Sequence, residues 1–144
     1  MIKKLPASSD FKRSTRPLFV PTHVNSRLNG ALERYMLSVD PDISARLSGI
    51  DQDNLLTYNG CIITRPRYPI RSFVVAPVRK HPHSFVELDL QALCRNIASA
   101  LKKVGESSVE VIREYMNVGG FQEQSYHVFM DELERRVDVY EYRL

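Results

Sequence analysis

The chain has 144 residues, of which 43% are hydrophobic and 26% are charged, and its formal net charge at pH 7 is +3. This length fits one domain that buries its own core, and no apolar run approaches the roughly 18 residues that a membrane-spanning helix needs. Residues 1–83 carry 13 Lys and Arg against 6 Asp and Glu, whereas residues 106–144 carry 4 against 9. The composition excludes a membrane-spanning or wholly disordered protein and favours contact with a polyanion or with another protein.

The first 22 residues are predicted to form an extended basic arm, because Pro6, Pro17 and Pro21 disfavour a helix there. Its basic residues are Lys3, Lys4, Lys12, Arg13 and Arg16. Residues 23–144 are expected to form a single α+β domain. The N-terminus lacks the apolar segment of a signal peptide, so we expect a protein of the cytoplasm, or of a particle or assembly, that is not secreted by that route.

Two helices are predicted after the arm, over about residues 23–48. Apolar residues recur at helical spacing over 23–39. The second helix is short, with Asp40 as its N-cap, Pro41 as its first residue and Gly49 at its end.

A small three-stranded antiparallel sheet is predicted over about residues 53–76. Asn59 and Gly60 stand between two apolar, partly β-branched runs, which is the sequence of a two-residue type I′ hairpin. A third strand is expected over 72–76. The proline-containing segment 65–71 is expected to join it to the hairpin as a stiff loop.

Three helices are predicted over about residues 84–140. The first starts with the capping-box residues Ser84 and Glu87 and continues as one apolar stripe. The second covers 108–117, and the third ends in the segment 137–140, which could equally be a terminal strand. The predicted fold is therefore α+β, with a small antiparallel sheet flanked by helices and preceded by the basic arm.

No motif of an enzyme active site is present, and the protein is predicted not to be an enzyme. No serine stands in a Gly-x-Ser-x-Gly setting, and no phosphate-binding glycine loop is found. His81 and His83 offer two metal ligands, but Pro82 separates them and no Tyr-x-x-Lys of a nuclease follows. No cofactor or metal is predicted, although metal binding by these histidines stays open. Cys61 and Cys94, without a short spacing, are expected to be small core residues.

Two groups of residues are candidate contact surfaces. Arginine binds phosphate and aromatic rings stack on bases, as in proteins that bind single-stranded nucleic acid. The basic group, for a protein partner or for nucleic acid, consists of Lys3, Lys4, Lys12, Arg13, Arg16, Arg65, Arg67, Tyr68, Arg71, Arg79 and Lys80. The acidic group, a docking face on the predicted C-terminal helices, consists of Glu110, Glu114, Asp131, Glu134 and Asp138. The alternative for both groups is that they only solvate exposed faces.

Two functions fit these surfaces. The first is a non-enzymatic structural subunit of a larger assembly, such as a virus or phage particle, whose basic arm contacts neighbouring subunits. The alternative is a nucleic-acid-binding protein that uses the arm and the region Arg65 to Lys80 on phosphates. The expected partners are other protein subunits, like or unlike copies, and under the alternative nucleic acid. No membrane contact is expected.

Overall fold

The structure is a computed structural model that describes residues 2–5, 10–23, 31–43, 60–64, 70–79, 89–118 and 121–144. Its strands are β1 (Lys3–Lys4), β2 (Leu18–His23), β3 (Ile62–Ile63), β4 (Phe73–Arg79), β5 (Ser108–Ile112) and β6 (Asp138–Tyr142). Its helices are the 3-10 helix η1 (Phe11–Arg13) and the α-helices α1 (Ala31–Val39), α3 (Leu90–Lys103), α4 (Arg113–Val118) and α5 (Glu123–Glu134).

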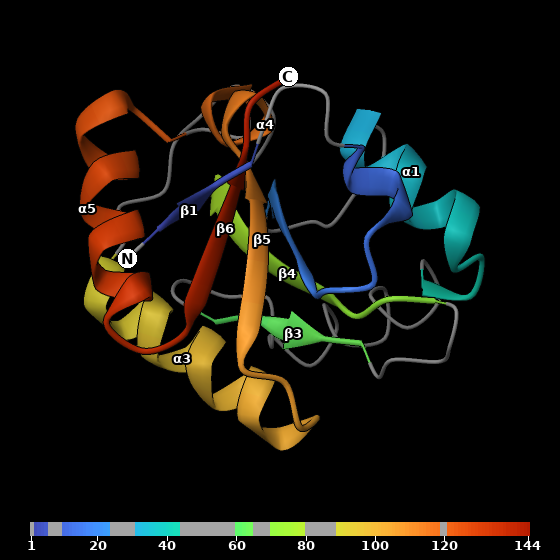
Figure 1. Ribbon diagram of the computed structural model, residues 1–144, viewed down its shortest axis with the longest axis horizontal. Helices are drawn as coiled ribbons and strands as arrows, with labels where there is room; N and C mark the ends of the chain where they lie inside the picture. Colours follow the sequence, from blue (N-terminus) through green and yellow to red (C-terminus); the bar gives the residue numbers. More distant parts are fainter. Residues whose placement is uncertain are drawn as a thin grey trace.

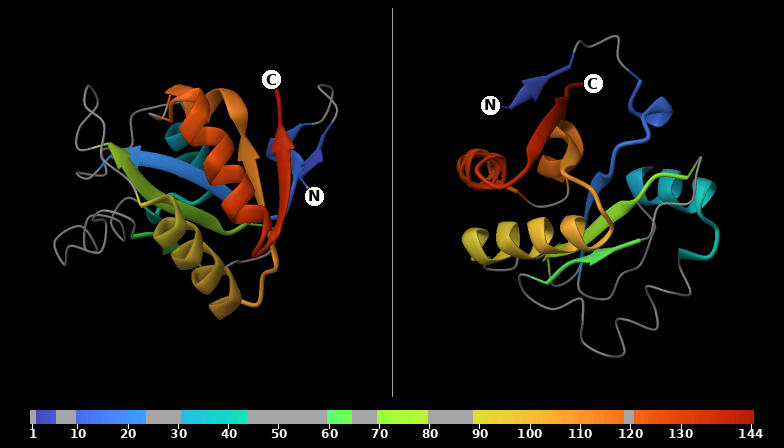
Figure 2. Two further views of the ribbon diagram at one scale, coloured as in Figure 1. Left: turned by 90° about the vertical axis from the view of Figure 1, so that its left-hand side faces the viewer. Right: turned by 60° about the horizontal axis from the view of Figure 1, so that its bottom comes forward.

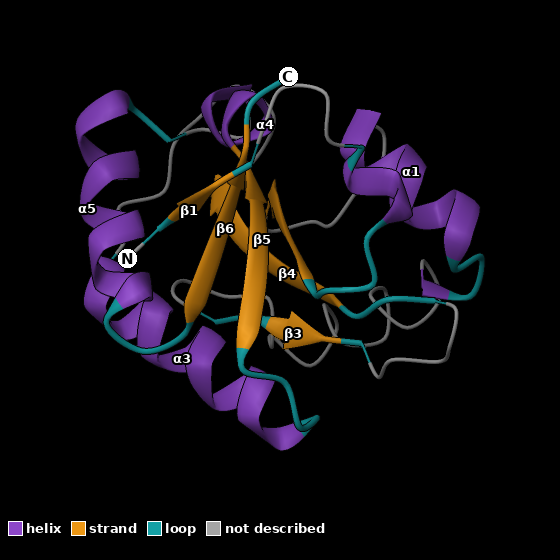
Figure 3. Ribbon diagram, in the orientation of Figure 1, coloured by secondary structure: helices purple, strands orange, loops and turns teal. Residues whose placement is uncertain are grey.

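The strands form one sheet in the order β1-β6-β5-β2-β4-β3 (Figure 1). All neighbouring strands run parallel except β3, which is antiparallel to β4. Parallel strands need long connections, and here α1, α3, α4 and α5 lie in the connections between them (Figure 3). The architecture is therefore α/β, with helices on both faces of a mostly parallel sheet.

Each face of the sheet carries its own apolar core. Successive residues of a strand point to opposite faces, so Phe19 packs on one side with α3 and α5, while Leu18 and Val20 pack on the other. On that second side the core includes Phe11 of η1 and Met36 of α1. Figure 2 shows α1 on the opposite side of the strands from α3 and α5. A sheet buried on both faces explains why its strands are rich in Val, Ile and Phe without regular polar alternation.

The predicted fold class is wrong, because the expected N-terminal arm belongs to the sheet. Its residues form β1 at one edge and β2 in the interior. The prolines of this segment do not prevent pairing. The N–H of Leu18 donates to Ser72 O on the β4 side at 3.0 Å, and Pro17 O accepts from the Glu110 N–H on the β5 side at 2.7 Å. The backbone groups of successive β2 residues face β4 and β5 in turn, so the Pro21 nitrogen faces β5. The single described pair between β2 and β5, Leu18 with Glu110, lies three residues before Pro21. The N–H that Pro21 lacks is therefore not needed for pairing with the described residues of β5.

The C-terminal helices are also corrected. The helix predicted over 108–117 is the strand β5 followed by the short helix α4. The last predicted helix ends at Glu134, and the segment 137–140 lies largely in β6. Ser107 and Glu110 have the spacing of a capping box, but Glu110 is a fully buried strand residue. The spacing of Ser107 and Glu110 favours a helix there, but pairing with β2 and β6 stabilises a strand instead.

The remaining predicted elements are described only in part. The helix α3 starts at Leu90, with the Asp89 side chain accepting from the Ala92 N–H at 3.1 Å, so its N-cap is not the predicted Ser84. The hairpin residue Asn59 and the helix end Gly49 lie outside the described residues. The strand predicted over 72–76 falls largely within β4, but its long partner is the parallel strand β2. None of the helices described is long and apolar enough to cross a bilayer.

Candidate functional site

Four parallel strands, β2, β4, β5 and β6, end at the same edge of the sheet. In Figure 1, β5 and β6 lead upward to α4 and to the C-terminus, so this carboxyl edge lies at the top. The strand order reverses between β5 and β2, since the chain continues from β2 toward β4 on one side and from β5 to β6 on the other. Open α/β sheets bind their ligands outside the carboxyl ends of the strands at such a reversal.

The two strands at the reversal are paired only where β2 begins. Between β2 and β5 the described residues form one pair, Leu18 with Glu110, whereas β2 pairs with β4 from Leu18 to His23. β5 ends at Ile112 and passes directly into α4. The facing edges of β2 and β5 thus share no further paired residues toward their carboxyl ends, which leaves backbone and side-chain groups there for other contacts.

Two polar atoms buried near this edge have no hydrogen-bond partner within the part of the chain that the structure describes. They are Oγ1 of Thr22, a residue only 1% exposed near the end of β2, and Oε2 of Glu114 in the first turn of α4. Most buried polar groups in proteins are hydrogen-bonded, so such atoms mark a place where a ligand or water can bind.

Arg113, the first residue of α4, is held by neighbouring side chains. Its guanidinium forms an ion pair with Glu123 and lies 5.4 Å from the centre of the Tyr126 ring. Glu123 is also 3.2 Å from His127 Nε2. Tyr126 in turn donates a hydrogen bond to the buried Glu141 of β6. These contacts fix the start of α4 against α5 and β6.

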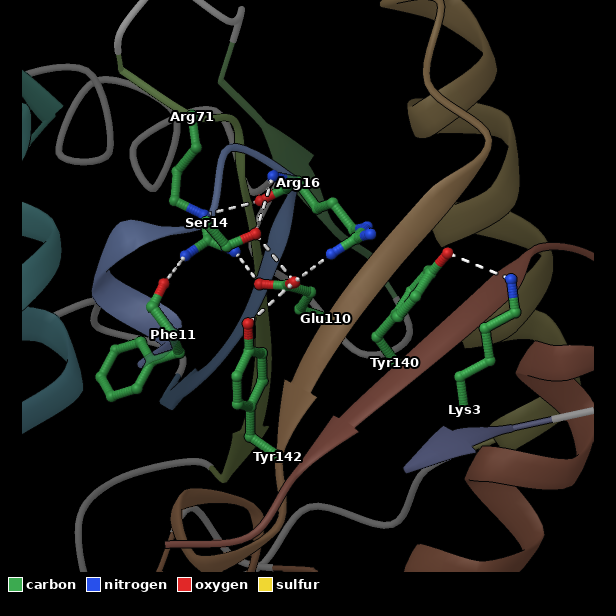
Figure 4. Close-up of polar contacts among 8 residues, drawn as sticks. All are labelled: Lys3, Phe11, Ser14, Arg16, Arg71, Glu110, Tyr140 and Tyr142. Atoms are coloured by element: carbon green, nitrogen blue, oxygen red, sulfur yellow. Dashed lines mark hydrogen bonds and ion pairs between the residues drawn. The ribbon is translucent and has the colours of Figure 1, made fainter. Parts of the chain in front are cut away.

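A buried ionic cluster lies at the first residue pair of β2 and β5 (Figure 4). Its centre is the fully buried carboxylate of Glu110, which forms ion pairs with Arg71 and with Arg16, the latter at 3.2 Å. Ser14 Oγ also donates to Glu110 at 2.8 Å. Arg71 further donates to Arg16 O and to Phe11 O, both at 2.6 Å. The cluster therefore joins residues 10–17 and the start of β4 to the middle of β5.

Tyr142 of β6 completes this cluster by donating from its hydroxyl to Glu110 Oε2 at 3.2 Å. Burial, followed by the negative charge of Glu110, raises the pKa of Tyr142, so the hydroxyl keeps its proton and remains a donor. With two arginines and two hydroxyls around it, the Glu110 carboxylate is compensated despite its burial. The cluster holds β2, β4, β5 and β6 together below the candidate site.

The members of the predicted basic group that the structure describes do not form one surface. Arg16 and Arg71 are used in the ionic cluster, and Lys3 donates to the Tyr140 hydroxyl at 3.2 Å. Lys4, Lys12 and Arg13 are exposed. Arg79 is the last residue of β4 and its side chain is not described, while Arg65, Arg67, Tyr68 and Lys80 lie outside the described residues. The basic front and the acidic tail do meet, but within one chain, where Arg16 and Arg71 bind Glu110.

The predicted acidic docking face must also be corrected. Glu110 is fully buried and therefore cannot be part of an exposed face. Glu114 lies in α4 with one oxygen buried, Asp131 is exposed on α5, Glu134 is half-buried at the end of α5, and Asp138 is exposed at the start of β6. The sequence predicted Glu110 on the solvent-exposed face of a helix, because a charged residue is usually exposed and Glu110 stands three residues after Ser107, as in a capping box.

The described residues hold no group of three or more His, Cys, Asp or Glu side chains that could bind a metal ion. His81 and His83 lie outside them. Cys61, which is half-buried, and the buried Cys94 are both free. Burial raises the pKa of Cys61 to about 11 and that of Cys94 to about 12, so neither thiol ionises near neutral pH as a nucleophile must.

No family model matches the sequence, and no curated protein matches it either. Solved structures, in contrast, match the fold along the whole chain. The macrodomain of Mycobacterium tuberculosis DarG aligns with a TM-score of 0.78 at 14% identity, covering 99% of this chain and 98% of that one. The macrodomain of Thermus aquaticus DarG gives 0.75 at 10% identity, covering 99% and 97%. The fold is that of macrodomains.

A third matching structure is Thermosipho africanus DarTG in complex with ADP-ribose. It aligns with a TM-score of 0.67 at 16% identity and covers 89% of this chain and 38% of that chain. The common fold at such low identity explains why the sequence alone gave no resemblance, since the same layers can be built from different apolar residues.

The functions predicted from the sequence are wrong. Both the assembly subunit and the nucleic-acid-binding alternative depended on a free basic arm, and that segment forms β1 and β2 of a macrodomain fold. The prediction that the protein is not an enzyme rested only on the absence of sequence motifs, and the same structural matches overturn it. Thr22 was not among the predicted site residues, and Glu114 was assigned to the acidic docking face. The signal that could have found both is a polar residue one or two positions after each of two buried apolar runs.

Proposed function

We propose that the protein binds ADP-ribose at the carboxyl edge of its sheet and hydrolyses the bond that links ADP-ribose to another molecule. The observation that carries this proposal is the match to the macrodomain of M. tuberculosis DarG over nearly the full length of both chains. The complex of T. africanus DarTG with ADP-ribose supports the choice of ligand. The strand reversal between β5 and β2 supports the choice of edge.

The residues that end β4, or follow it in the sequence, have the charge that this ligand requires. ADP-ribose carries a diphosphate, which arginine, lysine and backbone N–H groups bind well. β4 ends at Arg79, and Lys80 and His81 come next in the chain. Under the nucleic-acid alternative, Arg79 and Lys80 were predicted from the sequence to contact phosphate. We now assign that phosphate to the diphosphate of ADP-ribose rather than to a nucleic acid.

The proposed reaction is hydrolysis at the anomeric carbon of the terminal ribose. The bond from this carbon to the attached group breaks, and the oxygen of water bonds to the carbon in its place. One proton of the water goes to the leaving group, so the products are free ADP-ribose and the unmodified molecule. A site outside the strand ends can hold the nucleotide while the attached molecule stays in solvent. Contact with other protein subunits remains a prediction.

Isothermal titration calorimetry with ADP-ribose tests binding, with AMP as the comparison ligand. We expect ADP-ribose to bind at least tenfold more tightly than AMP, because it offers a second phosphate and a second ribose. Lys80→Ala should weaken ADP-ribose binding about tenfold, the loss of one charge-assisted hydrogen bond. Lys4→Ala, at the exposed sheet edge, is the matched control and should bind as the wild type does. No measurable heat with millimolar ADP-ribose would contradict the proposal.

Hydrolysis is tested separately, by incubating the protein with an ADP-ribosylated polymer and measuring free ADP-ribose by chromatography. Wild-type protein should release ADP-ribose, and Lys80→Ala should release it more slowly. If the protein binds ADP-ribose but releases none, only the binding part of the proposal stands.

A further inference from the structure

Three buried side-chain atoms in the described part of the chain have no hydrogen-bond partner. They belong to Thr22, Ser72 and Glu114. A buried polar atom without a partner is unfavourable, because it has lost its contacts with water and gained none in return. Two of the three lie where the strands that flank the reversal of strand order end, Thr22 within the last part of β2 and Glu114 two residues after β5, whereas Ser72 precedes β4 at the opposite edge of the sheet.

Thr22 and Glu114 lie at the carboxyl ends of two neighbouring strands, Thr22 near the end of β2 and Glu114 in the first turn of α4, which directly follows β5. The pair between β2 and β5 is Leu18 with Glu110. Thr22 comes four residues after Leu18, and Glu114 comes four residues after Glu110. Both therefore lie past the point at which β2 and β5 stop pairing. On β2, Thr22 points to the same face as Leu18, because strand residues an even number apart share a face.

The neighbouring cation does not satisfy Glu114. Arg113 is paired with Glu123 and lies against the Tyr126 ring. The unpartnered oxygen of Glu114 is a hydrogen-bond acceptor, and a carboxylate that faces a phosphate would be repelled by it. A hydroxyl group, in contrast, can donate to this oxygen. The Thr22 hydroxyl both donates and accepts, which also suits a ribose diol.

We propose that Thr22 and Glu114 bind a ribose diol of ADP-ribose, and that the diphosphate lies away from Glu114. The inference rests on the proposed function and assigns one part of the ligand to the start of α4. Since both atoms are already withdrawn from water, a hydrogen bond from the ligand replaces no strong contact with solvent and so contributes strongly to affinity.

Calorimetry with ADP-ribose tests the inference on a set of matched variants. Thr22→Val removes the hydroxyl at nearly constant volume and should weaken binding about fivefold, whereas Thr22→Ser keeps the hydroxyl and should bind as the wild type does. Glu114→Ala should weaken binding at least about tenfold, because the acceptor is charged. Ser72→Ala removes the third unpartnered atom, at the other edge, and should leave binding unchanged.

Whether Glu114→Gln weakens or strengthens ADP-ribose binding distinguishes a ribose hydroxyl from a phosphate at this side chain. Glu114→Gln removes the negative charge, so it should weaken binding if a hydroxyl donates to this side chain. Tighter binding by Glu114→Gln would mean that a phosphate lies there and would overturn the inference. Wild-type affinity in both Thr22→Val and Glu114→Ala would overturn it as well, while the proposed function would stand. A wild-type protein that binds no ADP-ribose would overturn the proposed function and this assignment together.

A measurement without ligand tests the premise independently. If the Thr22 hydroxyl has no partner, Thr22→Val should raise the melting temperature of the free protein by a few degrees. The change in melting temperature of Ser72→Ala, which also removes a buried unpartnered hydroxyl, is the comparison. A fall of several degrees in Thr22→Val would show that the hydroxyl is bonded within the protein, which overturns the inference whatever the ligand.

Discussion

Arg71 and Glu110 form an ion pair in which both side chains are almost completely buried. The pair joins Arg71, two positions before β4, to the middle of β5, across β2, which begins between them. Three strands that are far apart in the sequence thus meet at one charged contact. The contact lies at the amino ends of β2 and β4, so it supports the candidate site without being part of it.

Breaking this pair should strongly destabilise the protein. Arg71→Met leaves the Glu110 carboxylate buried with less compensation, and the expected loss in the free energy of unfolding is about 3–5 kcal/mol. Urea unfolding measures it. Arg13→Ala is the matched control, because this arginine is 88% exposed and its ion pair with Asp10 should contribute less than about 1 kcal/mol.

The double variant Arg71→Met with Glu110→Leu extends this test. If the cost of the single variant comes from an uncompensated charge, removing both charges should restore part of the lost stability. A double variant whose loss of stability relative to the wild type equals the sum of the losses in the two single variants would contradict this account.

The position of Pro21 predicts that replacing it is nearly neutral. Its nitrogen faces the side of β2 on which no described residue of β5 is paired with it, so Pro21→Ala should change the free energy of unfolding by less than about 1 kcal/mol. Val20→Pro is the contrasting change, since the backbone of Val20 faces β4 and its N–H would be lost from the ladder. That variant should cost about 3 kcal/mol or more, measured by urea unfolding. Equal losses in the free energy of unfolding would refute the assignment of Val20 to the β4 side and Pro21 to the β5 side.

Gly105 ends α3 with a positive φ of 77°. The Glu106 N–H donates to Leu101 O at 2.9 Å and the Gly105 N–H to Lys102 O at 3.1 Å, which closes the helix in the left-handed conformation. A Cβ at this position would meet no atom within 4 Å, so the cost of Gly105→Ala is backbone strain alone, about 1 kcal/mol. Gly105→Asn should cost less, because asparagine tolerates this conformation better. Thermal unfolding compares them, and an alanine variant as stable as the asparagine variant would argue against strain.

The buried tyrosine Tyr126 should make stability fall at alkaline pH. Burial, and then its hydrogen bond to Glu141, raise its pKa above the ordinary value of 10.0. As the pH rises, the unfolded chain loses this proton before the folded protein does, so the stabilisation is complete below about pH 10 and declines above it. Tyr126→Phe should lose stability less steeply between pH 9 and 11. Absorbance at 295 nm provides the check: ionisation of all seven tyrosines near pH 10 in the folded protein would contradict it.

In the sequence, several strands are short runs of apolar residues that do not by themselves identify a strand. The strand predicted over 72–76 is confirmed from Phe73 onward, because a short apolar run of this kind is typical of a buried strand. Leu18 to Val20 is a run of the same kind, but Pro17 and Pro21 on either side of it led to the prediction of an extended arm instead of a strand in a sheet. The reason they are tolerated, the absence of paired β5 residues alongside Pro21, is a property of the sheet and is not encoded locally.

The candidate site was harder to predict than the strands. Glu110 and Glu114 have the same chemistry and similar neighbours in the sequence, yet the first is enclosed by Arg16 and Arg71 while the second has an unpartnered oxygen. That difference depends on residues about forty and ninety positions away. A single sequence offers no means of telling a structural carboxylate from one available to a ligand when the partners are so distant.

The two lysines of β1 have a consequence for how the protein behaves in concentrated solution. β1 is the outermost strand on one side of the sheet, and its side chains, Lys3 and Lys4, are exposed. It covers β6, whose backbone would otherwise offer an open edge for another molecule to pair with. A further strand could add to β1 only by placing its own side chains next to two adjacent positive charges. The basic start of the chain, which suggested attachment to neighbours, thus protects the sheet from growing into aggregates.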